Sequence, residues 1–125
     1  MTSKIVLVLL GGSIGALARY GTSLLAARWF GTAFPWGTLI VNLVGCFLIG
    51  LAFSLAERTH LMGPSARLFF VTGFLGALTT FSTYAQETVN SFRAATHLVT
   101  AANILLNNVL GLALVMVGLW LGRLK

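Results

Sequence analysis

The sequence predicts an all-α integral membrane protein with four transmembrane helices, and composition and span length are the observations that predict it. The chain has 125 residues, of which 58% are hydrophobic and only 8% charged, with a mean hydropathy of +0.95. A soluble domain carries about 25% charged residues, so lipid must solvate much of this surface. Four spans of about 20 apolar residues each use most of the length. We therefore expect a single transmembrane domain over residues 1–125.

The predicted spans cover roughly residues 5–27, 37–56, 66–92 and 98–121. The first connector contains Trp29, Phe30, Phe34 and Trp36, aromatic residues that suit the membrane–water interface, and Pro35, which suits the turn before a helix. An even number of spans places both termini on the same side of the membrane.

The net charge of +6 arises because the chain has only two acidic residues. In a membrane protein this charge favours anion handling or contact with lipid headgroups, and we expect no nucleic-acid partner. Basic residues are more frequent on the side of the termini, which indicates cytoplasmic termini. That side holds Lys4, Arg58, Arg67, Arg123 and Lys125, whereas the other side holds Arg28 and Arg93.

Small residues recur at helix-packing spacing in the first and last spans. Gly11 and Gly15 are four residues apart, as are Gly118 and Gly122. Helices in lipid associate through close backbone approach, so these faces are expected to contact other helices. Because four helices enclose little interior, a polar pathway is easier to build between two copies, and we expect a homodimer.

Polar side chains within spans are costly and are candidates for function. Arg19, near the far end of the first span, has two interpretations: an interfacial arginine that reaches toward water, or a positive group at the mouth of an anion path. Asn42 in the second span could join helices through its amide or present two N–H donors to a dehydrated anion. Asn107 and Asn108 in the fourth span pose the same alternatives.

The third span is unusually rich in glycine and hydroxyl residues. Gly73, Gly76, Thr79 and Thr80 are all weaker helix formers than alanine. A helix broken at mid-membrane would release backbone carbonyls that are tolerated only inside protein or beside a wet cavity, where they could coordinate a cation.

Two aromatic residues follow this segment. Phe81 and Tyr84 are three residues apart and share one helix face. Simple packing is one interpretation, and the other is contact between their electropositive ring edges and an anion. Glu87 is the only acid within a span, which leaves a proton-carrier role open for it.

Three stretches resemble the CrcB/Fluc family of fluoride channels, and the similarity extends over all four spans in order and spacing. They are Gly11-Gly12-Ser13-Ile14-Gly15-Ala16-Leu17-Ala18-Arg19-Tyr20, Gly37-Thr38-Leu39-Ile40-Val41-Asn42 and Gly73-Phe74-Leu75-Gly76-Ala77-Leu78-Thr79-Thr80-Phe81-Ser82-Thr83. The third stretch is the specific one. The resemblance implies an antiparallel, dual-topology homodimer that exports fluoride passively through two pores and protects the cell from fluoride, and it implies no enzymatic activity.

The resemblance also implies roles for particular residues. Asn42 is similar to a pore asparagine, Arg19 to a vestibule arginine, and Phe81 to the first of two pore aromatics. Gly76 and Thr79 resemble the break whose carbonyls, from both subunits, hold a structural sodium ion at the dimer centre. Thr38 and Ser82 resemble further polar positions close to the pathway. The implied location is the cell inner membrane or plasma membrane, as a multi-pass protein in contact with lipid.

Two positions depart from the family pattern. Tyr84 stands where better-known members have a second phenylalanine; its phenol keeps the ring edge and adds a donor, so we expect conduction with altered affinity or rate. In the fourth span Gly111 is followed by Leu112-Ala113-Leu114 rather than by hydroxyl residues. Any polar lining of a pore in this span must come from other residues, such as Asn107 or Asn108.

The distribution of basic residues, five on one side and two on the other, is not what insertion in both orientations would require.

The main alternative is a small four-helix multidrug-type cation/proton exporter. Such exporters need an acid buried in the first span, where this chain has Arg19 and no acid. A structural or lipid-interacting protein is a second alternative, and it would not need the polar third span.

Overall fold

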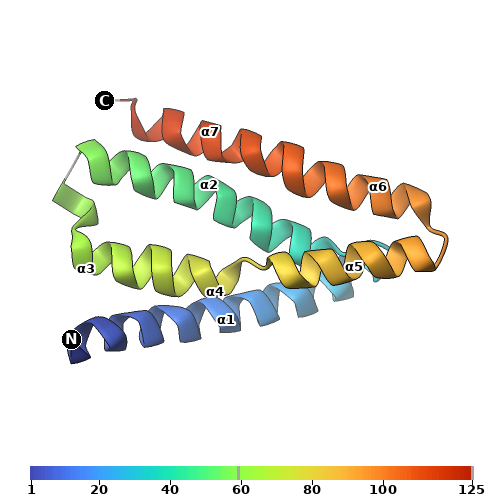
Figure 1. Ribbon diagram of the computed structural model, residues 1–125, viewed down its shortest axis with the longest axis horizontal. Coiled ribbons are helices and arrows are strands. Elements are labelled where there is room, and N and C mark those ends of the chain that lie inside the picture. Colours follow the sequence, from blue (N-terminus) through green and yellow to red (C-terminus); the bar gives the residue numbers. More distant parts are fainter. Residues whose placement is uncertain (59, 125) are drawn as a thin grey trace.

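The computed structural model describes residues 1–58 and 60–124, and these residues form a bundle of helices (Figure 1). The first two spans are α1 (Thr2–Phe30) and α2 (Trp36–Arg58), followed by the short 3₁₀ turn η1 (His60–Met62). The third span comprises α3 (Pro64–Arg67), η2 (Leu68–Leu75), α4 (Gly76–Leu78) and α5 (Phe81–Arg93). The fourth comprises α6 (His97–Leu105), η3 (Leu106–Leu110) and α7 (Gly111–Gly122).

Within residues 1–58 and 60–124, four helical stretches are long and apolar enough to cross a membrane by length and composition, which confirms the predicted all-α membrane class. These stretches are Thr2–Phe30, Trp36–Arg58, Pro64–Arg93 and His97–Gly122. Large apolar side chains are exposed along them, including Leu17 and Leu112, each 70% exposed. The N-terminus and the C-terminal end of α7 lie at the same end of the bundle (Figure 1).

Glycines set the closest helix contacts, as their spacing predicts. A Cβ atom on Gly11 or Gly15 of α1 would overlap the backbone carbonyls of Phe69 or Phe74 in η2. A Cβ atom on Gly118 of α7 would overlap the carbonyl of Phe47 in α2. The backbone approach is therefore close enough for direct packing of α1 on the third span and of α2 on α7.

The third span is broken, which confirms the predicted interruption, and the break lies at the threonines rather than at the glycines. Thr79 (φ −81°, ψ 154°) and Thr80 (φ −150°, ψ 116°) are extended. Gly73 and Gly76 lie within helical segments, and Gly73 is buried against α1. Thr80 then caps α5, because its Oγ1 accepts a hydrogen bond from the Thr83 N–H.

The fourth span contains a wide π-helical turn, η3, that the sequence did not predict. The side-chain amide of Asn107 donates to the Asn103 carbonyl, and that of Asn108 to the Ile104 carbonyl, each one turn earlier. These are the carbonyls that the N–H groups of Asn107 and Asn108 would bond in a regular α-helix. The asparagine side chains therefore favour the wider turn, a feature common at functional sites.

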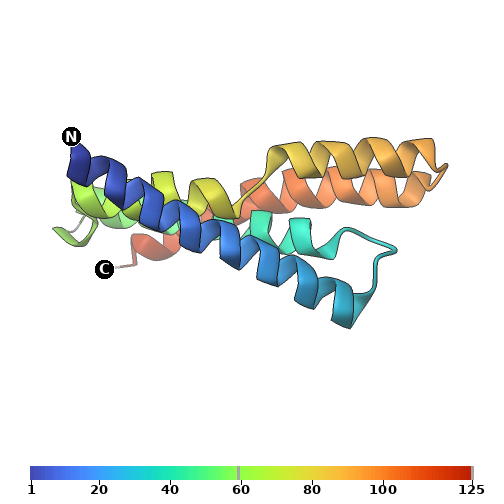
Figure 2. The same ribbon diagram turned by 90° about the horizontal axis from the view of Figure 1, so that it is seen from below.

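At the end of the bundle opposite the termini, the four spans form two arms (Figure 2). One arm is the hairpin of α5 and α6, and the other holds the end of α1 and the start of α2. Thr38 of α2 and Glu87 of α5 hydrogen-bond between the arms (Oγ1 to Oε1, 2.7 Å). A buried apolar cluster of Val41, Leu75 and Leu78 lies near the middle of the bundle, adjacent to the break.

Candidate functional site

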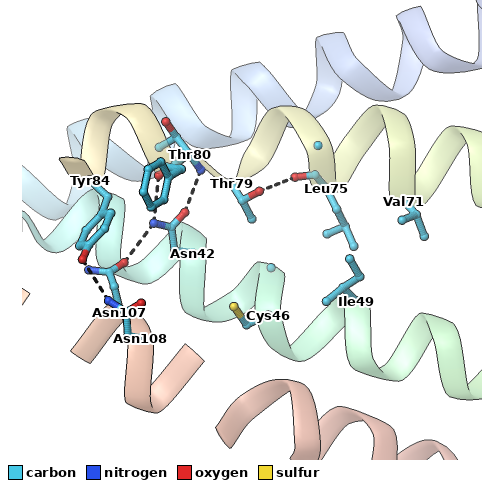
Figure 3. A pocket seen from close by; sticks show the side chains of 13 residues that line it. Asn42, Cys46, Ile49, Val71, Leu75, Thr79, Thr80, Tyr84, Asn107 and Asn108 are labelled. Carbon is cyan, nitrogen blue, oxygen red and sulfur yellow. Dashed lines mark hydrogen bonds between the residues drawn. The ribbon is translucent and has the colours of Figure 1, made fainter. Parts of the chain in front are cut away.

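The break in the third span opens onto a cavity of about 350 Å³, which we call the main cavity because it lies at the break and not because of its size (Figure 3). Its walls come from α2, from both sides of the break and from η3. Five of the residues to which the family resemblance gives pore or break positions lie on these walls, namely Asn42, Gly76, Thr79, Phe81 and Tyr84. Thr80, Asn107 and Asn108 complete its polar part. Gly45 of α2 makes room for the break, since a Cβ atom there would overlap the Thr79 methyl group.

Asn42 joins the broken helix to the fourth span. Its Oδ1 accepts a hydrogen bond from the Thr80 N–H (2.8 Å), while its Nδ2 donates to the Thr80 carbonyl (3.1 Å) and to Asn107 Oδ1 (3.0 Å). The Thr80 N–H can only donate, so it fixes the orientation of the amide. Both N–H donors of Asn42 are therefore committed within the chain, and the helix-joining interpretation describes this side chain in the structure.

A line of amides continues from Asn42 through the fourth span. Asn107 donates to Oδ1 of Asn103 (2.9 Å), and the fully buried Asn103 donates to Thr88 Oγ1 (2.9 Å). Thr88 in turn donates to the Tyr84 carbonyl (2.8 Å). Each member is oriented by the next, so the network ties α5, η3 and α2 together around the cavity.

Phe81 and Tyr84 present their rings side by side at the cavity. Their centroids are 5.5 Å apart and their planes are tilted by 57°. Phe81 is 78% exposed on the surface of the chain, and Tyr84 is half-buried. Asn108 Nδ2 lies 3.0 Å from the Tyr84 hydroxyl oxygen and donates to it (Figure 3). Aromatic rings have electropositive edges, and none of the described residues on the walls of this cavity is charged.

Arg19 lies in a second, smaller cavity on the other side of Thr80. It is half-buried, eleven residues before the end of α1, which is about 16 Å along the helix axis. The cavity also has Thr38, Thr80 and Thr83 on its walls. Because Thr80 borders both cavities, it separates the arginine from the aromatic pair.

Thr38 and Ser82 do not lie on the walls of the main cavity. Thr38 is buried and donates to Glu87, whose other carboxylate oxygen is buried without a hydrogen-bond partner among the described residues. Ser82 is exposed at the start of α5, with its Oγ 3.4 Å from Thr80 Oγ1, and lies on the walls of neither cavity. The structure therefore gathers the predicted site residues at three neighbouring places instead of one.

The carbonyls at the break are the candidate cation ligands. In a continuous helix the Thr80 N–H would bond the Gly76 carbonyl, but here it bonds Asn42. The carbonyls of Gly76 and Thr79 thus lie at the carboxyl end of a helical segment, where the backbone dipole favours a cation. Residues 1–58 and 60–124 contain no group of three or more His, Cys, Asp or Glu side chains that could hold a metal.

Three contributions were not assigned from the sequence. Asn107 and Asn108 were left as alternatives, because spacing alone cannot say which face of the fourth span meets α2. Thr80 was expected only to loosen the helix, and it instead forms the junction with Asn42. Cys46, a small apolar side chain in the second span, also lies on the wall of the main cavity.

Four apolar helices around a polar break, with an arginine nearby and no acid in the main cavity, define a multi-pass membrane protein of the channel or transporter class. The family model for "CrcB-like protein, Camphor Resistance (CrcB)" matches residues 6–119. The chain belongs to the CrcB family, which is a family of channels and not of enzymes.

Relatives of known name agree with this family. A fluoride-specific ion channel FluC of Salinibacter ruber is 48% identical over 115 residues, covering 92% of this chain and 86% of the relative. The FluC of Shewanella amazonensis is 44% identical over 93% of each chain, and that of Solidesulfovibrio magneticus is 41% identical over 99% of each. Family membership confirms the resemblance found from the motifs, and the alternative of a multidrug-type exporter is wrong.

Proposed function

We propose that this protein is a fluoride channel, which lets fluoride leave the cell passively across the inner or plasma membrane and so protects the cell from fluoride. The observation that carries the proposal is the cavity at the helix break, on whose walls Asn42, Phe81 and Tyr84 lie together in a chain of the CrcB family. The name of the FluC relatives supports fluoride as the ion.

The chemistry of the cavity suits a small, strongly hydrated anion. A pore for such an ion must replace its water with several weak donors, because a full positive charge would hold the ion too tightly to release it. Ring edges and the Tyr84 phenol are donors of this kind. Arg19 lies across Thr80 from the rings, where a fixed positive charge would raise the local concentration of anions before they reach the cavity.

The pore is proposed to form between two copies inserted in opposite directions, as an antiparallel homodimer. The main cavity opens at the surface of the chain, where Phe81 is 78% exposed beside polar groups that lipid would not satisfy. A second copy seated over this face would cover the cavity and complete the donor set.

A sodium ion at the centre of the dimer is part of the proposal. The Gly76 and Thr79 carbonyls at the end of α4 fit a hard cation, and the matching carbonyls of a second copy would complete the oxygen ligands. When bound, the ion would offset the cost of holding an anion in a low-dielectric site and would fix the two breaks relative to each other.

A liposome efflux measurement tests the function. Purified dimer is reconstituted into vesicles loaded with potassium fluoride, and release is started with valinomycin and followed with a fluoride electrode. We expect rapid fluoride release with no energy source, and far slower release of chloride from matched vesicles. Absence of fluoride release above that of protein-free vesicles, in protein that elutes as a folded dimer, would refute the proposal.

A further inference from the structure

The donors around the main cavity are unequally committed. Asn42, Asn107 and Asn108 each have two amide hydrogens, and each amide donates to two acceptors within the chain. The Thr79 hydroxyl donates to the Leu75 carbonyl, and the Thr80 hydroxyl to Thr83 Oγ1. Among the hydroxyl and amide groups on these walls, within residues 1–58 and 60–124, the Tyr84 phenol alone has no acceptor for its hydrogen.

The direction of the bond between Asn108 and Tyr84 explains why the phenol hydrogen is left over. The same Nδ2 of Asn108 donates to the Ile104 carbonyl (2.8 Å), an atom that can only accept. This bond fixes the amide with its NH₂ group toward the phenol, so the Tyr84 oxygen accepts and its own hydrogen remains available. An oxygen that accepts one hydrogen bond also becomes a stronger donor of the next.

The position of the phenol suits an anion ligand. Tyr84 comes from α5 and Asn108 from η3, and both lie on the cavity wall (Figure 3). The centroid of the Tyr84 ring lies 5.5 Å from that of the Phe81 ring, so the donor hydrogen and two aromatic rings occur within one small region. Asn108 restrains the hydroxyl in the position from which an anion in the cavity could reach it.

We propose that the Tyr84 hydroxyl donates a hydrogen bond to fluoride in the pore and that Asn108 is the positioning residue that keeps this hydrogen directed at the ion. This inference rests on the proposed function and adds to it a donor from this chain. Phe81 alone would offer the anion only a ring edge, whereas the Tyr84–Asn108 pair adds a neutral hydroxyl that stabilises it more strongly and still releases it.

The test measures the fluoride concentration at half-maximal flux in planar bilayers or liposomes for wild type, Tyr84→Phe, Asn108→Leu and the double variant. Tyr84→Phe should raise this concentration about tenfold, the value of one modest hydrogen bond to a charged ion. Asn108→Leu alone should raise the half-saturating fluoride concentration by less than Tyr84→Phe does. In the Tyr84→Phe background, Asn108→Leu should have no further effect. Asn108→Asp should raise it most, since a carboxylate would accept the phenol hydrogen and repel the anion. Val109→Ala, on the same helical turn but outside the cavity, should match wild type.

Equilibrium binding gives a second measurement on detergent-solubilised dimer. Sodium fluoride should raise the melting temperature of wild type above its value in sodium chloride, and Tyr84→Phe should lose part of this rise. The inference would be overturned if Tyr84→Phe left the half-saturating fluoride concentration unchanged. It would also be overturned if Asn108→Leu had an effect of equal size in the wild-type and Tyr84→Phe backgrounds. In either case, fluoride conduction by wild type would leave the proposed function standing. A wild-type protein that conducts no fluoride would overturn both.

Discussion

The side chain of Asn42 supplies the hydrogen bond that the backbone N–H of Thr80 loses where the third span breaks. The Thr80 N–H donates to Asn42 Oδ1 at 2.8 Å, and the Thr80 carbonyl accepts from Asn42 Nδ2 at 3.1 Å. An unpaired backbone group in the interior of a membrane protein costs several kcal/mol, so a break at this depth needs such a partner. The asparagine therefore makes the interrupted helix possible.

Replacing Asn42 should destabilise the fold as well as the pore. Asn42→Ala leaves the Thr80 N–H without a partner, and we expect a loss of about 1–3 kcal/mol in the free energy of unfolding. Asn42→Asp keeps an acceptor for the N–H and should lose less. The measurement is unfolding in detergent followed by tryptophan fluorescence. Asn90→Ala, an exposed asparagine on α5, is the control and should stay within about 0.5 kcal/mol of wild type. A wild-type transition for Asn42→Ala would show that the break is held by something else.

Removing the exposed ring should impair conduction without unfolding the protein. Phe81→Ile keeps an apolar side chain of similar size but loses the ring edge, so fluoride flux should fall about tenfold or more, as for a lost interaction of about 1.4 kcal/mol. The chain should remain folded, because Phe81 is 78% exposed within it and contributes little to its core, and dimer elution checks that the second copy still docks. Val89→Ala, exposed on the same helix but away from the cavity, should conduct like wild type. Equal fluxes for Phe81→Ile and wild type would exclude a pore role for this ring.

Two glycines on α1 offer a matched test of helix packing. Gly15→Ala places a Cβ atom against the Phe74 carbonyl and should destabilise the protein by about 1–3 kcal/mol, because neither backbone can yield easily. Gly12→Ala meets its nearest neighbour, the Gly73 carbonyl oxygen, at 4.0 Å and should be neutral or stabilising. The free energies of unfolding of the two variants, measured under the same conditions, test this prediction. Equal stability of the two variants would mean that α1 does not approach the third span this closely.

The antiparallel dimer predicts that single chains insert in both orientations. Cysteines are introduced one at a time at Ser3, near the termini, and at Ala33, in the opposite connector, after Cys46 is replaced by serine. A membrane-impermeant maleimide applied from outside the cell should label about half of the molecules at each site, because dual insertion requires little orientation bias. Labelling of one site only would establish a single orientation and would be consistent with the uneven count of basic residues.

Membrane class, number of spans and the presence of a break were open to prediction because they depend on local properties. Hydropathy averaged over about 20 residues indicates whether a helix is surrounded by lipid or by water. The spacing of Gly11 and Gly15 indicates a helix-packing face without any knowledge of the partner helix. The residues of the break were less predictable. Glycine and threonine both weaken a helix, and only the tertiary contacts decide that Gly73 packs against α1 while Thr79 and Thr80 leave the helix.

By itself, the sequence determined that this is a four-span membrane protein with a polar third span, and its motifs identified the family. The tertiary structure decided how the polar side chains are used. Asn42, Asn107 and Asn108 have the same amide chemistry, yet Asn42 and Asn107 hold the break together and Asn108 holds the Tyr84 hydroxyl. The physical reason is that an amide has two donors and one acceptor group, and its role depends on which partners from distant parts of the chain come within about 3 Å of it.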